Sequence, residues 1–335
     1  MADGSKLGTL RQMALLATAL VKIRVLRRPM PLFGEWNVTF RCNLRCKYCG
    51  ACNAAADELG TDDVQRGLDT LWDLGVRWLT FGGGEPLIRK DIGEILAHAR
   101  ARGFVVFLST NGWLVPQHMD DLRYVDHVNL SLDGPRAVHD DVRGPGAFDK
   151  TLEAAEACRQ GGISVSLQCV MSSYNLGVLD DVVAIARAQG LMVMFQPATK
   201  WLDSSTEANP IAPPVEPYRE AIAHLVELKR SGAPVRNSVA GLEHLAKWPD
   251  PTPIWCSAGV LTFSIEPDGT MLACHQAQVG RFLKGHRPGT ALDVQYADLS
   301  VPKGCVQCWC APMVELALLF SLRPAALWNA LRSYL

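Results

Sequence analysis

The sequence lacks an excess of positive charge and lacks any apolar run long enough to cross a bilayer. Its 33 Lys and Arg are balanced by 34 Asp and Glu, which gives a formal net charge of −1. Nucleic-acid binding rests on clustered cations that contact phosphates, so we expect no nucleic-acid partner. The apolar stretch at residues 13–21 is too short for a spanning helix, which needs about 20 residues. No A-x-A-type cleavage site follows it, which argues against a signal peptide.

Aromatic and charged residues are also modest in number, at 7% and 20%, whereas hydrophobic residues make up 48%. This composition indicates a globular chain without a disordered tract, and 335 residues favour one large domain with appendages. Cysteine is the exception, because there are eleven of them. In a long chain without an export signal they are more typical of metal ligands in a reducing compartment than of disulfides. We therefore expect a cytoplasmic protein.

Three of the cysteines lie within one short segment, Arg41 to Gly50, which reads RCNLRCKYCG. Their spacing is C-x3-C-x2-C, and a tight loop brings such thiols to one point. Soft thiolates bind zinc or an iron–sulfur cluster. Three local thiolates can hold a four-iron cluster and leave one iron open, whereas structural zinc takes four closed ligands. A zinc knuckle with a distant fourth ligand is the alternative.

From residue 36 onward, apolar and β-branched runs alternate with helical patterns. The expected strands are Trp36–Phe40, Trp78–Phe81, Val105–Leu108, His127–Leu132, Val165–Met171 and Met192–Gln196. Six such repeats predict an α/β fold with parallel strands and chemistry at the carboxyl ends of the strands. Polar motifs fall at those ends: the cysteine loop, GGGEP at 82–86, TNG at 110–112 and SLDG at 131–134.

The cysteine loop and GGGEP, one helix apart, resemble the radical S-adenosylmethionine (SAM) enzymes. The resemblance covers roughly Trp36 to Ala198 and implies a partial (β/α)6 TIM-like barrel over residues 35–235. It implies that Cys42, Cys46 and Cys49 hold a [4Fe–4S] cluster whose open iron binds SAM. An electron from a reductant such as flavodoxin or ferredoxin would cleave SAM to a 5′-deoxyadenosyl radical, which abstracts hydrogen from an unactivated C–H bond.

The resemblance also implies a set of SAM-binding residues. Gly83, Gly84 and Glu85 would lie against the SAM amino group, and Tyr48 near the adenine. Ser131 and Arg143 would hold the carboxylate or ribose. Pairing of Arg143 with Asp140 or Asp141 is the alternative for that residue. Thr110 and Asn111 would either reach the ribose or shape their own turn, and the SLDG motif adds Asp133 to the SAM-binding candidates.

A second group of cysteines follows a hairpin pattern with an Asp268-Gly269 turn. The group is similar to the twitch or shortened SPASM domain of radical SAM enzymes, here expected over residues 236–311. It implies one auxiliary [4Fe–4S] cluster on Cys256, Cys274, Cys305 and Cys308, with Cys310 able to replace Cys308. A zinc site is the alternative.

The two ends of the chain are apolar. Residues 1–34 predict a helix with basic flanks, and residues 312–335 predict another helix. The first would either pack against the barrel or lie in a membrane interface, which would place residues 1–30 in peripheral contact with the inner face of the membrane.

Two classes of substrate fit these features. A small or lipid-like molecule at the membrane is favoured by the apolar ends and by the short segment before the first strand. Peptide-modifying relatives often carry a longer leader-binding domain there, so maturation of a ribosomally made peptide is the alternative. A non-enzymatic iron–sulfur or zinc scaffold is the remote one.

Overall fold

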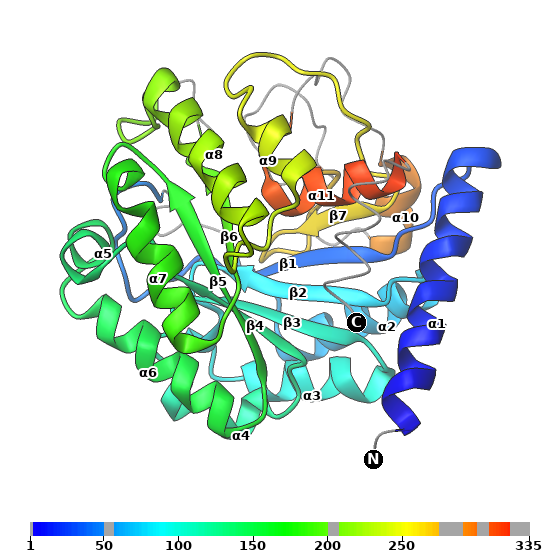
Figure 1. The fold of residues 1–335 in the computed structure, drawn as a ribbon. Helices are drawn as coiled ribbons and strands as arrows, with labels where there is room; N and C mark the ends of the chain where they lie inside the picture. Colours follow the sequence, from blue (N-terminus) through cyan, green and yellow to red (C-terminus); the bar gives the residue numbers. More distant parts are fainter. Residues whose placement is uncertain (1–2, 50–56, 200–207, 275–290, 300–307, 322–335) are drawn as a thin grey trace.

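The computed structural model describes residues 3–49, 57–199, 208–274, 291–299 and 308–321. Its centre is one eight-stranded sheet in the order β6-β5-β4-β3-β2-β1-β7-β8 (Figure 1). The strands are β1 (Phe33–Thr39), β2 (Trp78–Gly83), β3 (Val105–Thr110), β4 (His127–Ser131), β5 (Ser164–Met171), β6 (Val193–Pro197), β7 (Thr262–Ile265) and β8 (Met271–Leu272).

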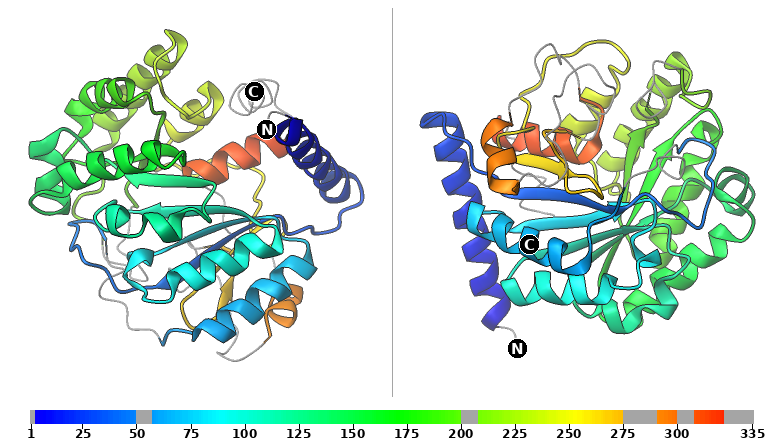
Figure 2. Two further views of the ribbon diagram at one scale, coloured as in Figure 1. Left: turned by 90° about the horizontal axis from the view of Figure 1, so that it is seen from below. Right: turned by 180° about the vertical axis from the view of Figure 1, so that it is seen from behind.

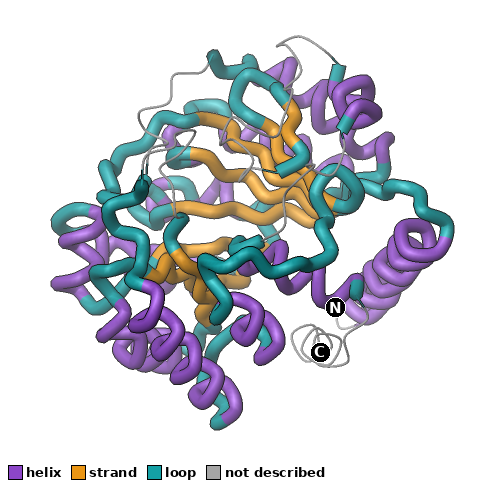
Figure 3. The backbone as a smooth tube through the Cα atoms, turned by 90° about the horizontal axis from the view of Figure 1, so that it is seen from above, coloured by secondary structure: helices purple, strands orange, loops and turns teal. Residues whose placement is uncertain are grey.

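The first six strands pair in parallel and in sequence order, as repeated β/α units require. Helices and short 3-10 turns connect them and cover the outside of the sheet (Figure 3). They are α2 (Thr61–Leu74), η3 (Pro86–Ile88), α3 (Ile92–Arg102), η4 (Val115–Gln117), α4 (Met119–Leu122), α5 (Arg136–Arg143), α6 (Ala147–Gln160), η5 (Leu176–Val178) and α7 (Leu179–Gln189). The predicted partial (β/α)6 barrel is therefore confirmed.

The pleat of the strands separates a core face from a polar face. In β4, Val128 and Leu130 are fully buried, and the alternate residues His127, Asn129 and Ser131 are partly exposed. Side chains of a strand alternate between its two faces, so the apolar set faces the helices and the polar set faces the opposite side of the sheet. The polar face ends at the strand termini where the sequence motifs lie.

The predicted hairpin forms around Asp268-Gly269, where Gly269 adopts a φ of 83°. Its first strand, β7, pairs in parallel with β1, and its second, β8, runs antiparallel to β7. The C-terminal segment thus continues the sheet of the barrel. The domain boundaries given above stay a prediction.

Four further helices follow β6 in the described part of the chain: α8 (Val215–Arg230), α9 (Val239–Leu245), α10 (Leu292–Asp298) and α11 (Ala311–Phe320). The C-terminal helix predicted over 312–335 is described only to residue 321, and the remainder lies outside the described residues. No helix in the described part of the chain is long and apolar enough to cross a membrane.

The N-terminal helix α1 (Asp3–Leu20) continues into a π-helical turn, η1 (Val21–Val25). One face of this unit packs on a separate apolar cluster that includes Leu32, Trp78, Leu261 and Phe320. Trp78 opens its strand, so α1 lies at the amino end of the sheet (Figures 1 and 2). The expectation of a helix packed against the barrel is correct for that face.

Candidate cofactor site

The cysteine loop leaves β1 at its carboxyl end. The Cys49 amide donates to the Cys46 carbonyl at 3.1 Å, which closes a tight turn around the second and third thiols. The Leu44 amide donates to the Cys42 sulfur at 3.4 Å. Cys46 interacts electrostatically with both Cys42 and Cys49, so the three sulfurs occupy one neighbourhood.

The GGGEP motif docks on the first residues of that loop. The Gly84 amide donates to the Thr39 carbonyl at 2.8 Å, and the Glu85 amide donates to the Arg41 carbonyl at 2.9 Å. A Cβ on Gly84 would lie 2.3 Å from the Arg41 oxygen, and one on Gly83 would lie 2.1 Å from the Thr39 oxygen. Gly83 also has a φ of 119°, which L side chains rarely adopt. Because they lack a Cβ, these glycines let the backbone of GGGEP lie directly against the start of the cysteine loop.

Glu85 is fully buried and joins the ends of β2 and β3. Its carboxylate accepts from the Thr110 hydroxyl at 2.8 Å and from the amides of Asn111 and Leu87 at 2.9 and 3.1 Å. Burial raises the pKa of Glu85, and these hydrogen bonds oppose that shift. Thr110 in turn accepts from the Gly112 amide at 3.1 Å. These contacts place Thr110 in the turn after β3, and its contact with the ribose stays a prediction.

Asn111 reaches from the end of β3 to the cysteine loop. Its Nδ2 donates to Asn43 Oδ1 at 2.8 Å and lies 3.9 Å from the Cys42 sulfur. Its Oδ1 accepts from the Trp113 amide at 2.9 Å, which fixes the orientation of the side-chain amide. Cys42 therefore has two N–H groups directed at its sulfur, one from Leu44 and one from Asn111.

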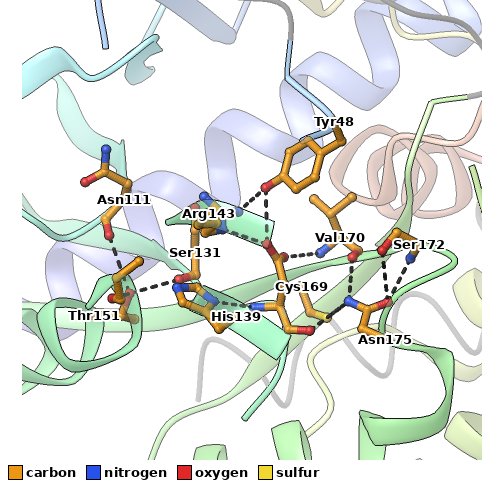
Figure 4. A network of polar contacts seen from close by, with 12 residues as sticks. Tyr48, Asn111, Ser131, His139, Arg143, Thr151, Cys169, Val170, Ser172 and Asn175 are labelled. Atoms are coloured by element: carbon orange, nitrogen blue, oxygen red, sulfur yellow. Dashed lines mark hydrogen bonds and ion pairs between the residues drawn. The ribbon is translucent and has the colours of Figure 1, made fainter. Parts of the chain in front are cut away.

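A buried ion pair lies near the second cysteine, Cys46, with which Arg143 interacts electrostatically; Figure 4 shows Arg143 beside Tyr48 of the cysteine loop. Arg143 Nε donates to Asp133 Oδ2 at 2.6 Å, and Arg143 Nη2 donates to the Tyr48 hydroxyl. Burial alone would lower the pKa of Arg143, but the Asp133 carboxylate holds it above its usual value, so the guanidinium stays charged. The alternative that Arg143 pairs with Asp140 or Asp141 is wrong.

Those two aspartates are used elsewhere. Asp140 accepts from the amides of Gly146 and Phe148 at 3.0 and 2.8 Å, which orders the start of α6. Asp141 pairs with Lys47 at 2.8 Å, and the Lys47 amide donates to the Val142 carbonyl. The cysteine loop is thereby fixed to the end of α5.

Asp133 is a hub that links three segments. Its Oδ1 accepts from the Val170 amide at 3.0 Å, and its own amide donates to His139 Nδ1 at 3.0 Å. Asn175 donates to the Asp133 carbonyl at 2.8 Å (Figure 4). Ser131, which ends β4, accepts from the Thr151 hydroxyl through its carbonyl at 3.2 Å. The sequence analysis did not identify His139 and Asn175 as site residues, because only the fold shows that they contact Asp133 of the SLDG motif.

The loop fits an iron–sulfur cluster by its donor set. Burial raises the pKa of Cys46 to about 11, and the Arg143 charge opposes that shift. A thiol in this setting gives up its proton when iron binds, as cluster ligation requires. Sulfur atoms of iron–sulfur clusters and of their cysteine ligands commonly accept hydrogen bonds, and the N–H groups directed at the Cys42 sulfur are donors of this kind. Within the described residues no three His, Cys, Asp or Glu side chains gather closely enough to share one metal ion.

The C-terminal cysteines meet near the start of α11. Cys310 precedes this helix, and burial raises its pKa; the charges of Cys308, Glu35 and Cys274 act in the same direction. Cys308 and Cys274 are therefore its neighbours in space. Cys305 lies outside the described residues.

Glu35, Asn37 and Gly82 were not singled out from the sequence as site residues. A Cβ on Gly82 would lie 3.8 Å from both Glu35 Oε1 and Asn37 Oδ1, so these groups share one face of β1 and β2. Asn37 also donates to Glu266 at 3.3 Å. The sequence EWNVT could have indicated that Glu35 and Asn37 share a face, because they are two residues apart in an otherwise apolar strand.

Known proteins match the part of the chain that contains the cysteine loop and the GGGEP motif. Residues 36–183 match the sequence model described as "Radical SAM superfamily". The mycofactocin maturase MftC of Mycobacterium ulcerans is 32% identical over 279 residues, which cover 76% of this chain and 71% of the relative. The Fe-coproporphyrin III synthase of Methanosarcina barkeri is 38% identical over 148 residues, covering 42% of this chain and 37% of the relative.

Solved structures resemble the fold at low identity. Streptococcus suis SuiB bound to S-adenosylmethionine has a TM-score of 0.66 at 18% identity, over 84% of this chain and 69% of that chain. Native anSMEcpe with bound AdoMet has a TM-score of 0.64 at 19% identity, over 81% of both chains.

Proposed function

Because this chain belongs to the radical SAM superfamily, we propose that it is a maturase that uses radical SAM chemistry to modify a peptide. Family membership makes the chain an enzyme that binds a [4Fe–4S] cluster and SAM. The alternative of a non-enzymatic scaffold is thereby set aside. The observation that carries the peptide proposal is the 32% identity with a maturase over 76% of this chain.

Cys42, Cys46 and Cys49 would hold the cluster, which supplies the electron that cleaves SAM when both are bound. The chain's own residues position this site. Gly84 lets the second strand dock on the cysteine loop, and Asn111 donates toward the Cys42 sulfur. Donors to cluster sulfurs favour the reduced state, because they stabilise the added negative charge.

The SAM-binding role of the rim residues is part of the proposal. Arg143 uses Nε and Nη2 for Asp133 and Tyr48, and among the described residues Nη1 has no hydrogen-bond partner. An Arg fork suits a carboxylate, so Nη1 is the donor we assign to SAM, together with the Ser131 hydroxyl. The Tyr48 ring is held in place through its hydroxyl and is assigned to the adenine. Gly83 and Glu85 shape the same rim.

One auxiliary [4Fe–4S] cluster is proposed at the start of α11. Cys274, Cys308 and Cys310 support it, because each interacts electrostatically within one group. Cys256 and Cys305 are retained as candidate ligands from the sequence. A cluster with four thiolates would act as an electron relay, and flavodoxin or ferredoxin is the proposed reductant.

The comparisons favour a peptide over the small or lipid-like substrate that the apolar ends suggested. The two relatives named above are named for different products, a mycofactocin and an Fe-coproporphyrin, so the substrate is the point to test. The holoenzyme is incubated with SAM, dithionite and precursor peptides encoded beside its gene, and 5′-deoxyadenosine is measured. Deuterium transferred from a perdeuterated peptide into 5′-deoxyadenosine supports the proposal. Transfer only from a lipid extract or a porphyrin contradicts it.

A further inference from the structure

We propose that the outer face of α1 and η1, with the cations that follow, docks the protein on an anionic lipid surface. This inference goes beyond the peptide-modifying activity and does not depend on it.

The helix has two apolar faces, and the described residues of the chain cover one of them. Leu15, Leu16, Ala19, Leu20 and Ile23 belong to the cluster that packs at the amino end of the sheet, and Ala19 and Ile23 are buried. Residues at those spacings form one side of a helix with 3.6 residues per turn. The opposite side is directed away from the barrel, as the position of α1 on the edge of the molecule shows (Figure 2).

That opposite side is apolar where a surface helix is normally charged. The exposed fraction is 46% for Met13, 51% for Val21, 70% for Val25 and 55% for Leu26. Thr18 is exposed as well, but its hydroxyl donates to the Ala14 carbonyl at 2.8 Å and so is satisfied within the helix. Exposed apolar patches of this kind mark surfaces that contact something else.

Positive charge is concentrated in the same segment. Residues 4–34 contain six Lys and Arg and no Asp or Glu, which leaves 27 Lys and Arg against 34 Asp and Glu, a charge of −7, for the rest of the chain. Lys22, Arg27 and Arg28 are exposed beside the apolar face, and Arg24 lies over the Trp255 ring at 5.6 Å. An apolar face with flanking cations fits the interface of an anionic membrane.

The placement separates docking from catalysis. The cluster under α1 contains Phe33, Trp78 and Val105, the first residues of β1, β2 and β3. The cysteine loop and GGGEP lie at the opposite ends of those strands. A membrane bound by α1 therefore faces the end of the barrel without the cofactor motifs, and the lipid contact does not deliver substrate.

The test is flotation of the holoenzyme with liposomes of phosphatidylglycerol and phosphatidylcholine, compared with phosphatidylcholine alone. We expect flotation only with the anionic vesicles. Val21→Asp/Val25→Asp and Arg27→Glu/Arg28→Glu should each weaken it by about tenfold or more. Matched controls are Met192→Asp, 40% exposed elsewhere, and Arg187→Glu/Lys247→Glu, which changes the net charge equally; both should float as wild type does.

Other results overturn the proposal. Wild type that stays unbound to both kinds of vesicle contradicts lipid docking by this face. A dimer that becomes a monomer in Val21→Asp/Val25→Asp, measured by light scattering, indicates a second copy as the occupant. Equal binding to neutral vesicles removes the role of the cations. In every variant 5′-deoxyadenosine formation without vesicles should equal that of wild type, so failure of docking is distinct from failure of the catalytic proposal.

Discussion

Arg143 and Asp133 form an ion pair next to the cysteine loop in which both side chains are buried, with 8% and 1% of their surfaces exposed. Removing one partner of such a pair leaves an uncompensated charge in a poorly solvated place. Asp133 would also lose the partner that helps to fix its contacts to Tyr48 and Val170. The pair therefore holds the cysteine loop, β4 and β5 together.

We predict that Arg143→Ala lowers the free energy of unfolding by about 3–5 kcal/mol. Arg159→Ala is the control, because Arg159 makes an equally short pair with Glu156 but is exposed. That change should hardly alter stability, since exposed pairs contribute little. Urea unfolding of both variants checks this, and similar effects of the two substitutions would show that burial of the pair is unimportant.

His127 contributes, as His139 does, to the sensitivity of the folded protein to acid. Burial and the charge of Arg236, which lies 3.3 Å from His127 Nε2, lower its pKa to about 4 from an ordinary value of 6.5. Below pH 6.5 the unfolded chain therefore binds a proton that the folded chain does not. Stability falls as the pH drops from about 6.5 to about 4.

The His127 contribution to this loss should be about 2–4 kcal/mol near pH 4. His127→Gln should flatten the slope of stability against pH between 4.5 and 6.5. Arg236→Gln should flatten it less, because burial remains. Thermal midpoints measured across this range test the sign, and a His127→Gln protein as acid-sensitive as wild type would refute the assignment.

Single residues also show the limits of prediction from sequence. The three cysteines and Glu85 were recognisable, because spacing and motif identify them. The Asp133 partner of Arg143 was not, since two nearer aspartates, Asp140 and Asp141, compete for it in the sequence. The contact of Asn111 with the Cys42 sulfur depends on how two loops meet, which local pattern does not contain.

The glycines of the GGGEP motif, which follows β2 and packs on the cysteine loop, differ in the space around them. Gly84 has no room for a Cβ, whereas a Cβ on Gly82 would have neighbours only at 3.8 Å and beyond. The structure therefore assigns the tight packing to Gly84 and leaves Gly82 at an ordinary contact distance. Overpacking of this kind costs about 1–3 kcal/mol and shifts the backbone.

We predict that Gly84→Ala displaces the cysteine loop, so that the purified protein holds fewer irons and forms little 5′-deoxyadenosine. Gly82→Ala should keep its iron and most of its activity. Iron content and a SAM-cleavage assay on both proteins separate the two cases. Loss of iron in Gly82→Ala alone would contradict the assignment.

Strands and helices were predictable where the pattern is long and periodic. The six strands appear with boundaries shifted by up to three residues, as at β1, which begins at Phe33 and not at Trp36. Between β3 and β4 the expected helical segment is only the short η4 and the single turn α4. A segment of that length has too few residues to fix a helical period. Which face of α1 packs on the sheet could be decided only from the fold, because its sequence is apolar on both sides.

The molecule as a whole brings two groups of cysteines to one barrel. The first group follows β1, and the second precedes α11 and interacts with Glu35 on β1. The sequence identifies the cysteines of the second group but does not show where they lie relative to the barrel, because they are separated by up to 54 residues. Cys158 and Cys169 are buried in the core and serve as internal controls.

We predict that Cys274→Ala lowers the iron content by about four atoms per chain, while Cys158→Ala leaves it unchanged. The auxiliary cluster depends on Cys274, whereas Cys158 packs as a small apolar residue. Iron and sulfide analysis of anaerobically purified protein checks both. Equal iron in Cys274→Ala and wild type would remove Cys274 from the ligand set.

The most direct test of the catalytic account is 5′-deoxyadenosine formation with dithionite, measured beside iron content in wild type and in Cys42→Ala/Cys46→Ala/Cys49→Ala. The account predicts about eight irons in wild type, about four in the triple variant, and SAM cleavage only in wild type. Zinc in place of iron, or cleavage that survives in the triple variant, would contradict the assignment of the cofactor to this loop.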